Sequence, residues 1–136
     1  MDFFFNPDGV AIIGATDNPF KGGYHILNNI IGGYQGRIYP VNPRFQTLQG
    51  LPCYASIDDI PEDFDLAIYF IPAQSLEETI AQCARKGVKG IIIESAGFSE
   101  VGAQGRQLQQ RCLDLARRHG IRLWGPNCMG LLDGHR

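Results

Sequence analysis

The sequence GVAIIG at residues 9–14 predicts the first strand of this chain and, with it, the class of fold. Between the two glycines, Val10 to Ile13 are apolar on both alternating faces, which is typical of a strand that helices cover on each side. From Gly22 to Ile31, apolar residues recur at spacings of three and four until Gly32 and Gly33 end the pattern. This spacing predicts a helix directly after the first strand.

The alternation of strand and helix continues along the chain. Further strands are predicted at 37–41, 66–71, 90–94 and 121–124, with helices between 72 and 87 and from 104 to 119. Residues 44–65 are rich in turn formers and predict irregular surface structure, with one helical turn near 57–60. The order implies an α/β fold of the doubly wound, Rossmann-like kind: one domain, 1–136, with a parallel five-stranded sheet and helices on both faces.

Composition narrows the range of partners. The chain has a formal net charge of -2, so it lacks the basic field that binding to nucleic acid requires. No apolar run approaches the roughly 20 residues that span a bilayer, and no basic segment precedes the N-terminal phenylalanines, so no membrane partner is expected. The four cysteines, Cys53, Cys83, Cys112 and Cys128, form no C-x-x-C pair, so no metal site is expected. Reduced thiols and a cytoplasmic location are the expectation.

A ligand site is predicted at one edge of the sheet. Parallel strands bring their carboxyl ends together, and doubly wound proteins bind ligands at that edge, near the point where the strand order reverses. The loops that follow the five predicted strands contain small, polar or proline residues at 14–16, 42–44, 72–73, 96–98 and 125–127. Turn chemistry accounts for any one of these loops, but their coincidence along one edge favours a binding site.

The first two loops indicate a phosphorylated nucleotide. The first leads into a helix N-terminus, where N–H groups and the helix dipole favour an anion, with Thr16, Asn18 and Lys21 as further donors. Thr16 interrupts the G-x-G-x-x-G pattern of NAD sites. Arg44 follows the second strand, where an NAD site carries a carboxylate. A guanidinium there suits a phosphorylated ribose, which leaves both NADP and coenzyme A open.

Five motifs in order along the chain carry a family resemblance. They are FFNPDGVAIIGAT, YPVNPR, IYFIPA, IIIESAGFSEVG and GPNCMG. Together they resemble the N-terminal CoA-binding domain of NDP-forming acyl-CoA synthetases, which are relatives of the succinyl-CoA synthetase α subunit. The same module also occurs fused to GNAT-type domains in protein lysine acetyltransferases and as small CoA-binding proteins.

The resemblance implies that coenzyme A lies along the carboxyl edge of the sheet. The residues that it assigns to the nucleotide phosphates are Gly14, Ala15, Thr16, Asn18 and Lys21. Those assigned to the adenosine side are Val41, Pro43 and Arg44, with Pro72 and Ala73 as a wall beside the cofactor. Those assigned to the pantetheine path and the thiol are Ser95, Ala96, Gly97, Phe98, Pro126, Asn127 and Cys128. In the family the residue at Arg44 is more usually a lysine.

The resemblance also implies what this chain lacks. Family enzymes transfer a phosphoryl group through a histidine on a later domain and bind ATP or GTP with Mg²⁺ on an ATP-grasp domain. His25, His119 and His135 match no phosphohistidine motif, and the chain is expected to be part of a longer protein. We therefore expect that the chain binds CoA or acyl-CoA, positions the thiol for acyl transfer and contributes no catalytic residue of its own.

Three alternatives remain open from the sequence. The domain could belong to a GNAT-fused protein lysine acetyltransferase, which the downstream sequence would distinguish. It could be an NADP-binding oxidoreductase domain, which Arg44 favours and Thr16 opposes. It could also be a stand-alone CoA-binding module.

Overall fold

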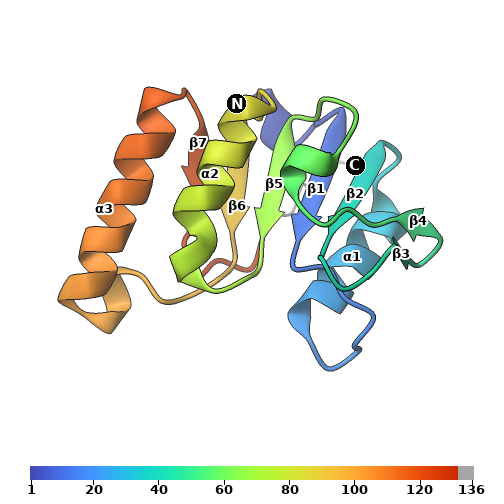
Figure 1. The fold of residues 1–136 in the computed structure, drawn as a ribbon, viewed down its shortest axis with the longest axis horizontal. Coiled ribbons are helices and arrows are strands. Elements are labelled where there is room, and N and C mark those ends of the chain that lie inside the picture. The colour runs from blue at the N-terminus through green and yellow to red at the C-terminus, as the bar shows by residue number, and fades with distance from the viewer. Residues whose placement is uncertain (132–136) are drawn as a thin grey trace.

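Five parallel strands form the centre of the structure, a computed structural model that describes residues 1–131 (Figure 1). The main elements in chain order are β1 (Gly9–Ile13), α1 (Gly22–Gly33), β2 (Arg37–Val41), β5 (Leu66–Tyr69), α2 (Leu76–Arg85), β6 (Gly90–Ile93), α3 (Ala103–Arg118) and β7 (Arg122–Trp124). The strand order in the sheet is β2-β1-β5-β6-β7, and every neighbouring pair is parallel. The predicted doubly wound fold is confirmed.

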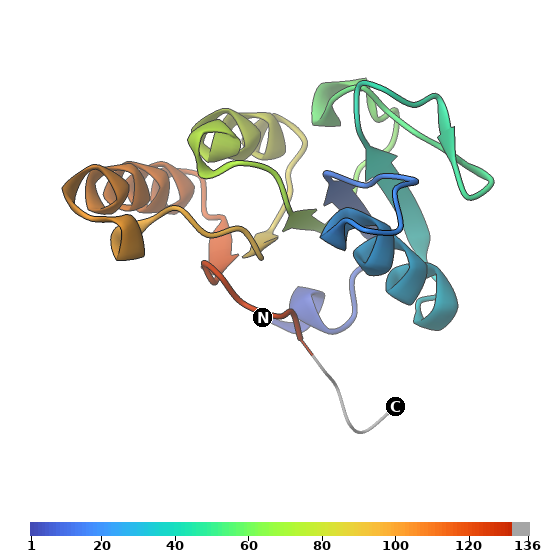
Figure 2. The ribbon, with the colours of Figure 1, turned by 90° about the horizontal axis from the view of Figure 1, so that it is seen from below.

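The helices divide between the two faces of the sheet (Figure 2). One face carries α1, and the opposite face carries α2 and α3 side by side. The chain runs outward from β1 to β2 and then returns to the other side of β1 to form β5, so the strand order reverses between β1 and β5. This reversal is the topological switch point at which doubly wound sheets bind ligands.

The shorter elements lie in the connections. They are the 3₁₀ turns η1 (Asp2–Phe4), η2 (Ile57–Asp59), η3 (Ala73–Ser75) and η4 (Ser99–Val101), and the two-residue strands β3 (Thr47–Leu48) and β4 (Leu51–Pro52). The turn η2 was expected, whereas the β3-β4 hairpin was not. Its strands are too short to show a period of two. The strand predicted at 66–71 ends at Tyr69, and α1 extends two residues beyond its predicted end.

Side chains of the central strands alternate between two cores. In β1, Ile13 packs in the cluster beneath α2 and α3, together with Tyr69 of β5. Its neighbour Ile12 faces the other way and packs with Leu27 of α1 and with Phe4, which precedes the sheet. Burial on both faces explains the continuous apolar runs of these strands. None of the helices within residues 1–131 is long and apolar enough to cross a membrane.

Two glycines allow three backbone segments to meet at the switch point. Gly14 follows β1 with a φ of 96°, and a β-carbon there would lie 2.3 Å from the carbonyl oxygen of Phe70. Gly23, in the first turn of α1, lies so close to the first loop that a β-carbon would be 1.9 Å from the carbonyl oxygen of Gly14. Only glycine fits such contacts without a shift of backbone.

The contact at Gly23 gives a stability prediction. Gly23→Ala should lower the free energy of unfolding by about 1–3 kcal/mol, because the added methyl group forces α1 away from the first loop. Gly32→Ala is the matched control in the same helix, since a β-carbon at Gly32 meets nothing within 4 Å. It should leave stability unchanged or raise it by up to about 1 kcal/mol. Equilibrium urea unfolding measures both, and equal stability of the two variants would contradict the packing described.

Candidate functional site

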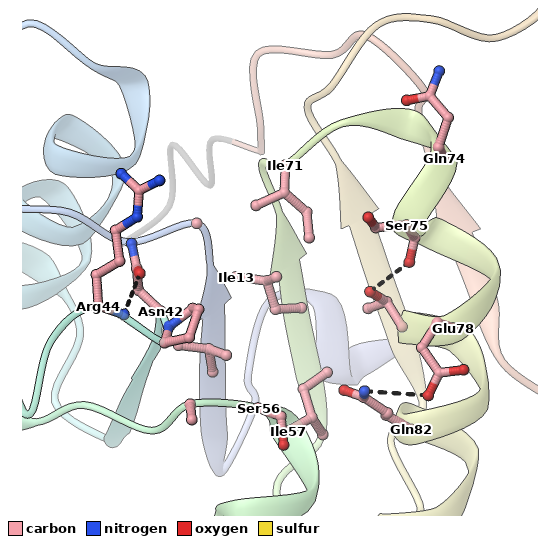
Figure 3. Close-up of a pocket in the computed structure, with 15 residues that line it drawn as sticks. Ile13, Asn42, Arg44, Ser56, Ile57, Ile71, Gln74, Ser75, Glu78 and Gln82 are labelled. Atoms are coloured by element: carbon pink, nitrogen blue, oxygen red, sulfur yellow. Dashed lines mark hydrogen bonds between the residues drawn. The ribbon is translucent and has the colours of Figure 1, made fainter.

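A pocket of about 510 Å³ opens beside α2 at the carboxyl edge of the sheet (Figure 3). We call it the α2-side pocket. Its lining residues are Ile13, Gly14, Val41, Asn42, Pro43, Arg44, Ala55, Ser56, Ile57, Ile71, Gln74, Ser75, Glu78, Thr79 and Gln82. They come from the ends of β1 and β2 and the loops that follow them, from the segment after β5 including η3, and from the first two turns of α2. The pocket therefore lies at the switch point.

A second pocket of about 560 Å³ lies on the α1 side of the same edge. We call it the α1-side pocket. Its lining residues are Gly14, Thr16, Lys21, Gly22, Gly23, Asn42, Arg44, Phe45, Phe70, Ile71 and Pro72. The two pockets share Gly14, Asn42, Arg44 and Ile71. They therefore adjoin, and we refer to them together as the switch-point crevice.

Positive charge gathers on the α1 side of the crevice. Lys21 and Arg44 are both exposed and both line the α1-side pocket. Lys21 is also the N-cap of α1, which has no side-chain cap and no acidic residue in its first turn. An uncapped helix N-terminus with two cations beside it favours a bound phosphate.

The α2 side of the crevice has a different chemistry. Glu78 and Gln82 of α2 line the pocket four residues apart, and Gln74 lines it from the turn η3 just before the helix (Figure 3). The Glu78 carboxylate accepts a hydrogen bond from Gln82 at 3.3 Å and lies 3.7 Å from Arg85. Amide groups, a partnered carboxylate and the apolar side chains of Ile13 and Ile71 suit an uncharged polar group such as a nucleoside.

Seven of the predicted site residues line the crevice: Gly14, Thr16, Lys21, Val41, Pro43, Arg44 and Pro72. Three others from the same loops do not. Ala15 and Ala73 are buried and line neither pocket. Asn18 instead closes a turn, because its side-chain oxygen accepts a hydrogen bond from the amide of Phe20 at 2.9 Å.

The remaining predicted residues, at the ends of β6 and β7, lie outside the two pockets. Ser95, after β6, is bonded to the segments after β5 and β7. Its hydroxyl donates to the Ile71 carbonyl at 2.7 Å, and its carbonyl accepts from the Asn127 amide at 3.0 Å. Gly97 lines a groove beside α3, while Phe98 and Pro126 line a smaller pocket of about 190 Å³. Of the last two predicted residues, Ala96 is exposed, and the Cys128 thiol donates a hydrogen bond to the Ile93 carbonyl at 3.3 Å.

Two carboxylates flank this second group of loops. Glu100 accepts hydrogen bonds from the backbone amides of Gly97 and, at 3.1 Å, of Phe98, and these bonds lower the pKa of its carboxyl. Glu94, directly after β6, is half-buried on the α1 face, and burial raises the pKa of its carboxyl. Within residues 1–131, no group of three or more His, Cys, Asp and Glu side chains is arranged to hold a metal ion. Of the histidines considered above, His135 lies outside the described residues.

Part of the crevice was not predicted from the sequence. Asn42, Phe45, Phe70 and Ile71 line it, as do the polar residues of α2. The spacing of Gln74, Glu78 and Gln82 was a usable signal, because a helix that begins at the ligand edge turns one polar stripe toward it. Asn42 lies in the loop 42–44 that the sequence placed at this edge, but its contact with Ala15, 27 residues away, left no local signal.

Comparison with known proteins identifies the family. The model of the family described as CoA binding domain matches residues 8–133. The α subunit of an ADP-forming acetate–CoA ligase II of Pyrococcus furiosus is 41% identical over 99% of this chain, which spans 30% of that subunit. The ADP-forming acetate–CoA ligase II of Archaeoglobus fulgidus is 46% identical over 95% of this chain, which spans 19% of that protein. The chain is therefore a fraction of the length of these relatives.

Solved structures agree with this assignment. A Pyrococcus horikoshii OT3 protein matches 98% of this chain with a TM-score of 0.93 and 42% identity, over 31% of its own length. A dinucleotide forming acetyl-coenzyme A synthetase 1 of Ca. Korarchaeum cryptofilum, solved with phosphate and ADP, matches 96% with a TM-score of 0.91 and 36% identity, over 28% of its own length.

These matches confirm the family that the sequence motifs suggested, and they favour coenzyme A over NADP, the two cofactors that Arg44 left open. The chain belongs to the CoA-binding domain family, in the form that it shares with ADP-forming acetate–CoA ligases, and coenzyme A is its cofactor.

Proposed function

We propose that this chain is the part of an NDP-forming acyl-CoA synthetase that holds coenzyme A and positions its thiol for acyl transfer. The observation that carries the proposal is the switch-point crevice, whose cationic side combines Arg44, Lys21 and the uncapped N-terminus of α1. The similarity to acetate–CoA ligases over nearly the whole chain supports the reaction class.

The chemistry of the crevice suggests how the nucleotide part of CoA is held. We assign the diphosphate to the N-terminus of α1 beside Lys21, and the 3'-phosphate to the exposed guanidinium of Arg44. The adenosine then faces Val41 and Pro43 in the α2-side pocket. A planar guanidinium makes two parallel hydrogen bonds to a phosphate, which a lysine in this place does not.

The pantetheine arm is proposed to run from the crevice along the loops after β6 and β7. Ser95, Ala96 and Gly97 would border the arm, with Phe98 packed beneath them. Pro126, Asn127 and Cys128 would reach the thiol. The domain would then accelerate acyl transfer by orientation of the thiol, since bringing reactants into line removes much of the entropic barrier.

The remaining steps are proposed to belong to other parts of the complete enzyme. A phosphohistidine segment and an ATP-grasp domain, with ATP or GTP and Mg²⁺, would form the acyl phosphate from which the CoA thiol takes the acyl group. We place the protein in the cytoplasm, where CoA-dependent ligases find their substrates. The four cysteines are free thiols in the structure, which suits a reducing compartment.

Arg44→Ala tests the proposed phosphate contact. It should weaken CoA binding about tenfold, because a hydrogen bond between charged groups contributes about 1.5–3 kcal/mol and exposure reduces that value. The same variant should bind 3'-dephospho-CoA as the unsubstituted chain does. Isothermal titration calorimetry at two salt concentrations measures both affinities, and the difference should shrink in high salt.

Arg118→Ala serves as the control for that titration. Arg118 is also exposed, but it lies in the last turn of α3, at the end of that helix remote from the carboxyl edge. Its loss should leave both affinities unchanged. If the unsubstituted chain bound 3'-dephospho-CoA as tightly as CoA, Arg44 would have no role in recognition of the 3'-phosphate.

The proposal that other domains form the acyl phosphate gives a further prediction. The purified 136-residue chain should bind CoA but form no acyl-CoA when incubated with acetate, ATP or GTP, and Mg²⁺. Thioester formation is followed by chromatography against an acyl-CoA standard, and CoA binding in the same preparation shows that the chain is folded. Detection of acetyl-CoA above a protein-free blank would contradict the proposal.

A further inference from the structure

Asn42 connects the two loops that carry the cations of the crevice. Its side-chain NH₂ group donates a hydrogen bond to the carbonyl oxygen of Ala15 at 2.9 Å. Its side-chain oxygen accepts one from the backbone amide of Arg44, also at 2.9 Å. One short side chain therefore holds the loop after β1 and the loop after β2 at a fixed separation.

The backbone of Asn42 is fixed as well. Its amide donates to the carbonyl of Tyr54 at 2.9 Å, and its carbonyl accepts from the amide of Phe45 at 3.4 Å. The residue is partly buried, although it lines both pockets of the crevice. With both ends of its side-chain amide bonded to protein, Asn42 is suited to hold other groups in place.

Arg44 is a side chain whose position would otherwise vary. The side chain is exposed and long, and ordering it against a ligand costs conformational entropy. The hydrogen bond from the Arg44 amide to Asn42 closes a turn in which the main chain at Arg44 has little freedom. Figure 3 shows the guanidinium extending from this turn beside Asn42 and away from Ser56 and Ile57.

The hydrogen bond from the Asn42 side chain to the Ala15 carbonyl fixes the orientation of that turn relative to the loop after β1. Ala15 is buried and lies directly before Thr16, in the loop that leads to the N-terminus of α1. The bond from Asn42 to the Ala15 carbonyl thus fixes Arg44 relative to the place where we assign the diphosphate. The two phosphate-binding groups can then match the limited range of distances that the ribose allows between the diphosphate and the 3'-phosphate of one ligand.

We propose that Asn42 is a positioning residue that sets the place of Arg44 relative to the first loop, and so gives the crevice its preference for a 3'-phosphorylated adenosine. This inference rests on the proposed CoA site. It predicts that loss of the Asn42 side chain removes the benefit of the 3'-phosphate while binding of the rest of the ligand is largely retained.

A double-mutant cycle tests the inference. The affinities of CoA and 3'-dephospho-CoA are measured by calorimetry for the unsubstituted chain, Asn42→Ala, Arg44→Ala and the double variant. The unsubstituted chain should prefer CoA about tenfold, and Asn42→Ala should reduce the preference to less than about threefold. In the Arg44→Ala background, Asn42→Ala should cost no further CoA affinity. Asn29→Ala, an exposed asparagine in α1, is the control and should keep the full preference.

The outcomes separate the two proposals. If the unsubstituted chain shows no preference for CoA, the proposed role of Arg44 fails, and the role of Asn42 fails with it. If the preference is present and depends on Arg44 but survives in Asn42→Ala, only the inference about Asn42 is overturned. A purely structural role for Asn42 would weaken both ligands equally and additively with Arg44→Ala.

Thermal melting of each variant without ligand shows whether it is folded. If Asn42→Ala does not fold, the cycle is run with Asn42→Ser, whose hydroxyl can still accept the turn hydrogen bond but lacks an amide to reach Ala15. A loss of the CoA preference in that folded variant supports the inference, and retention of the full preference contradicts it.

Discussion

Close approach of backbone at the switch point is the constraint on which the site depends. The end of β1, the end of β5 and the first turn of α1 meet around Gly14, where no β-carbon fits. Because these segments touch through backbone, the N-terminus of α1 opens directly onto the carboxyl edge of the sheet. Its dipole and the charges of Lys21 and Arg44 therefore act on the same small volume.

Two polar side chains hold the loops along this edge together. Asn42 joins the loop after β1 to the loop after β2. Ser95 joins the segment after β5 to the loop after β6, and its carbonyl receives the amide of Asn127 after β7. The bond from Asn42 to Ala15 and the two bonds of Ser95 each link one strand end to its neighbour in the sheet. The backbone bond from the Phe70 amide to the Ile13 carbonyl, at 2.9 Å, joins β1 to β5, so the ends of all five strands are connected. These connections limit the loop motion that ligand binding would otherwise have to restrict.

The sequence predicted the fold well because strand and helix patterns are local. The four apolar residues Val10 to Ile13 predict a strand covered on both faces, whatever segments pack against it. The alternation of strands and helices along the chain then predicts a parallel sheet. The crevice was less predictable. Ala15 and Ala73 lie in the right loops yet are buried, since the direction of a side chain in a turn depends on tertiary packing. The bridging role of Asn42 depends on Ala15, 27 residues away.

The same bonds indicate how the domain would contribute to acyl transfer in the proposed function, which assigns it no catalytic residue. In the proposed complex, the nucleotide is held at the start of α1 and the thiol near Cys128, whose own thiol is bonded to the Ile93 carbonyl at the end of β6. Both ends of the ligand path are therefore tied to strands of one sheet, β1 and β6, with β5 between them. A long flexible ligand bound at two such points loses its freedom on binding, before the reaction begins. The binding energy of the nucleotide then serves to place a sulfur atom far from it, which is how remote binding contributes to catalysis.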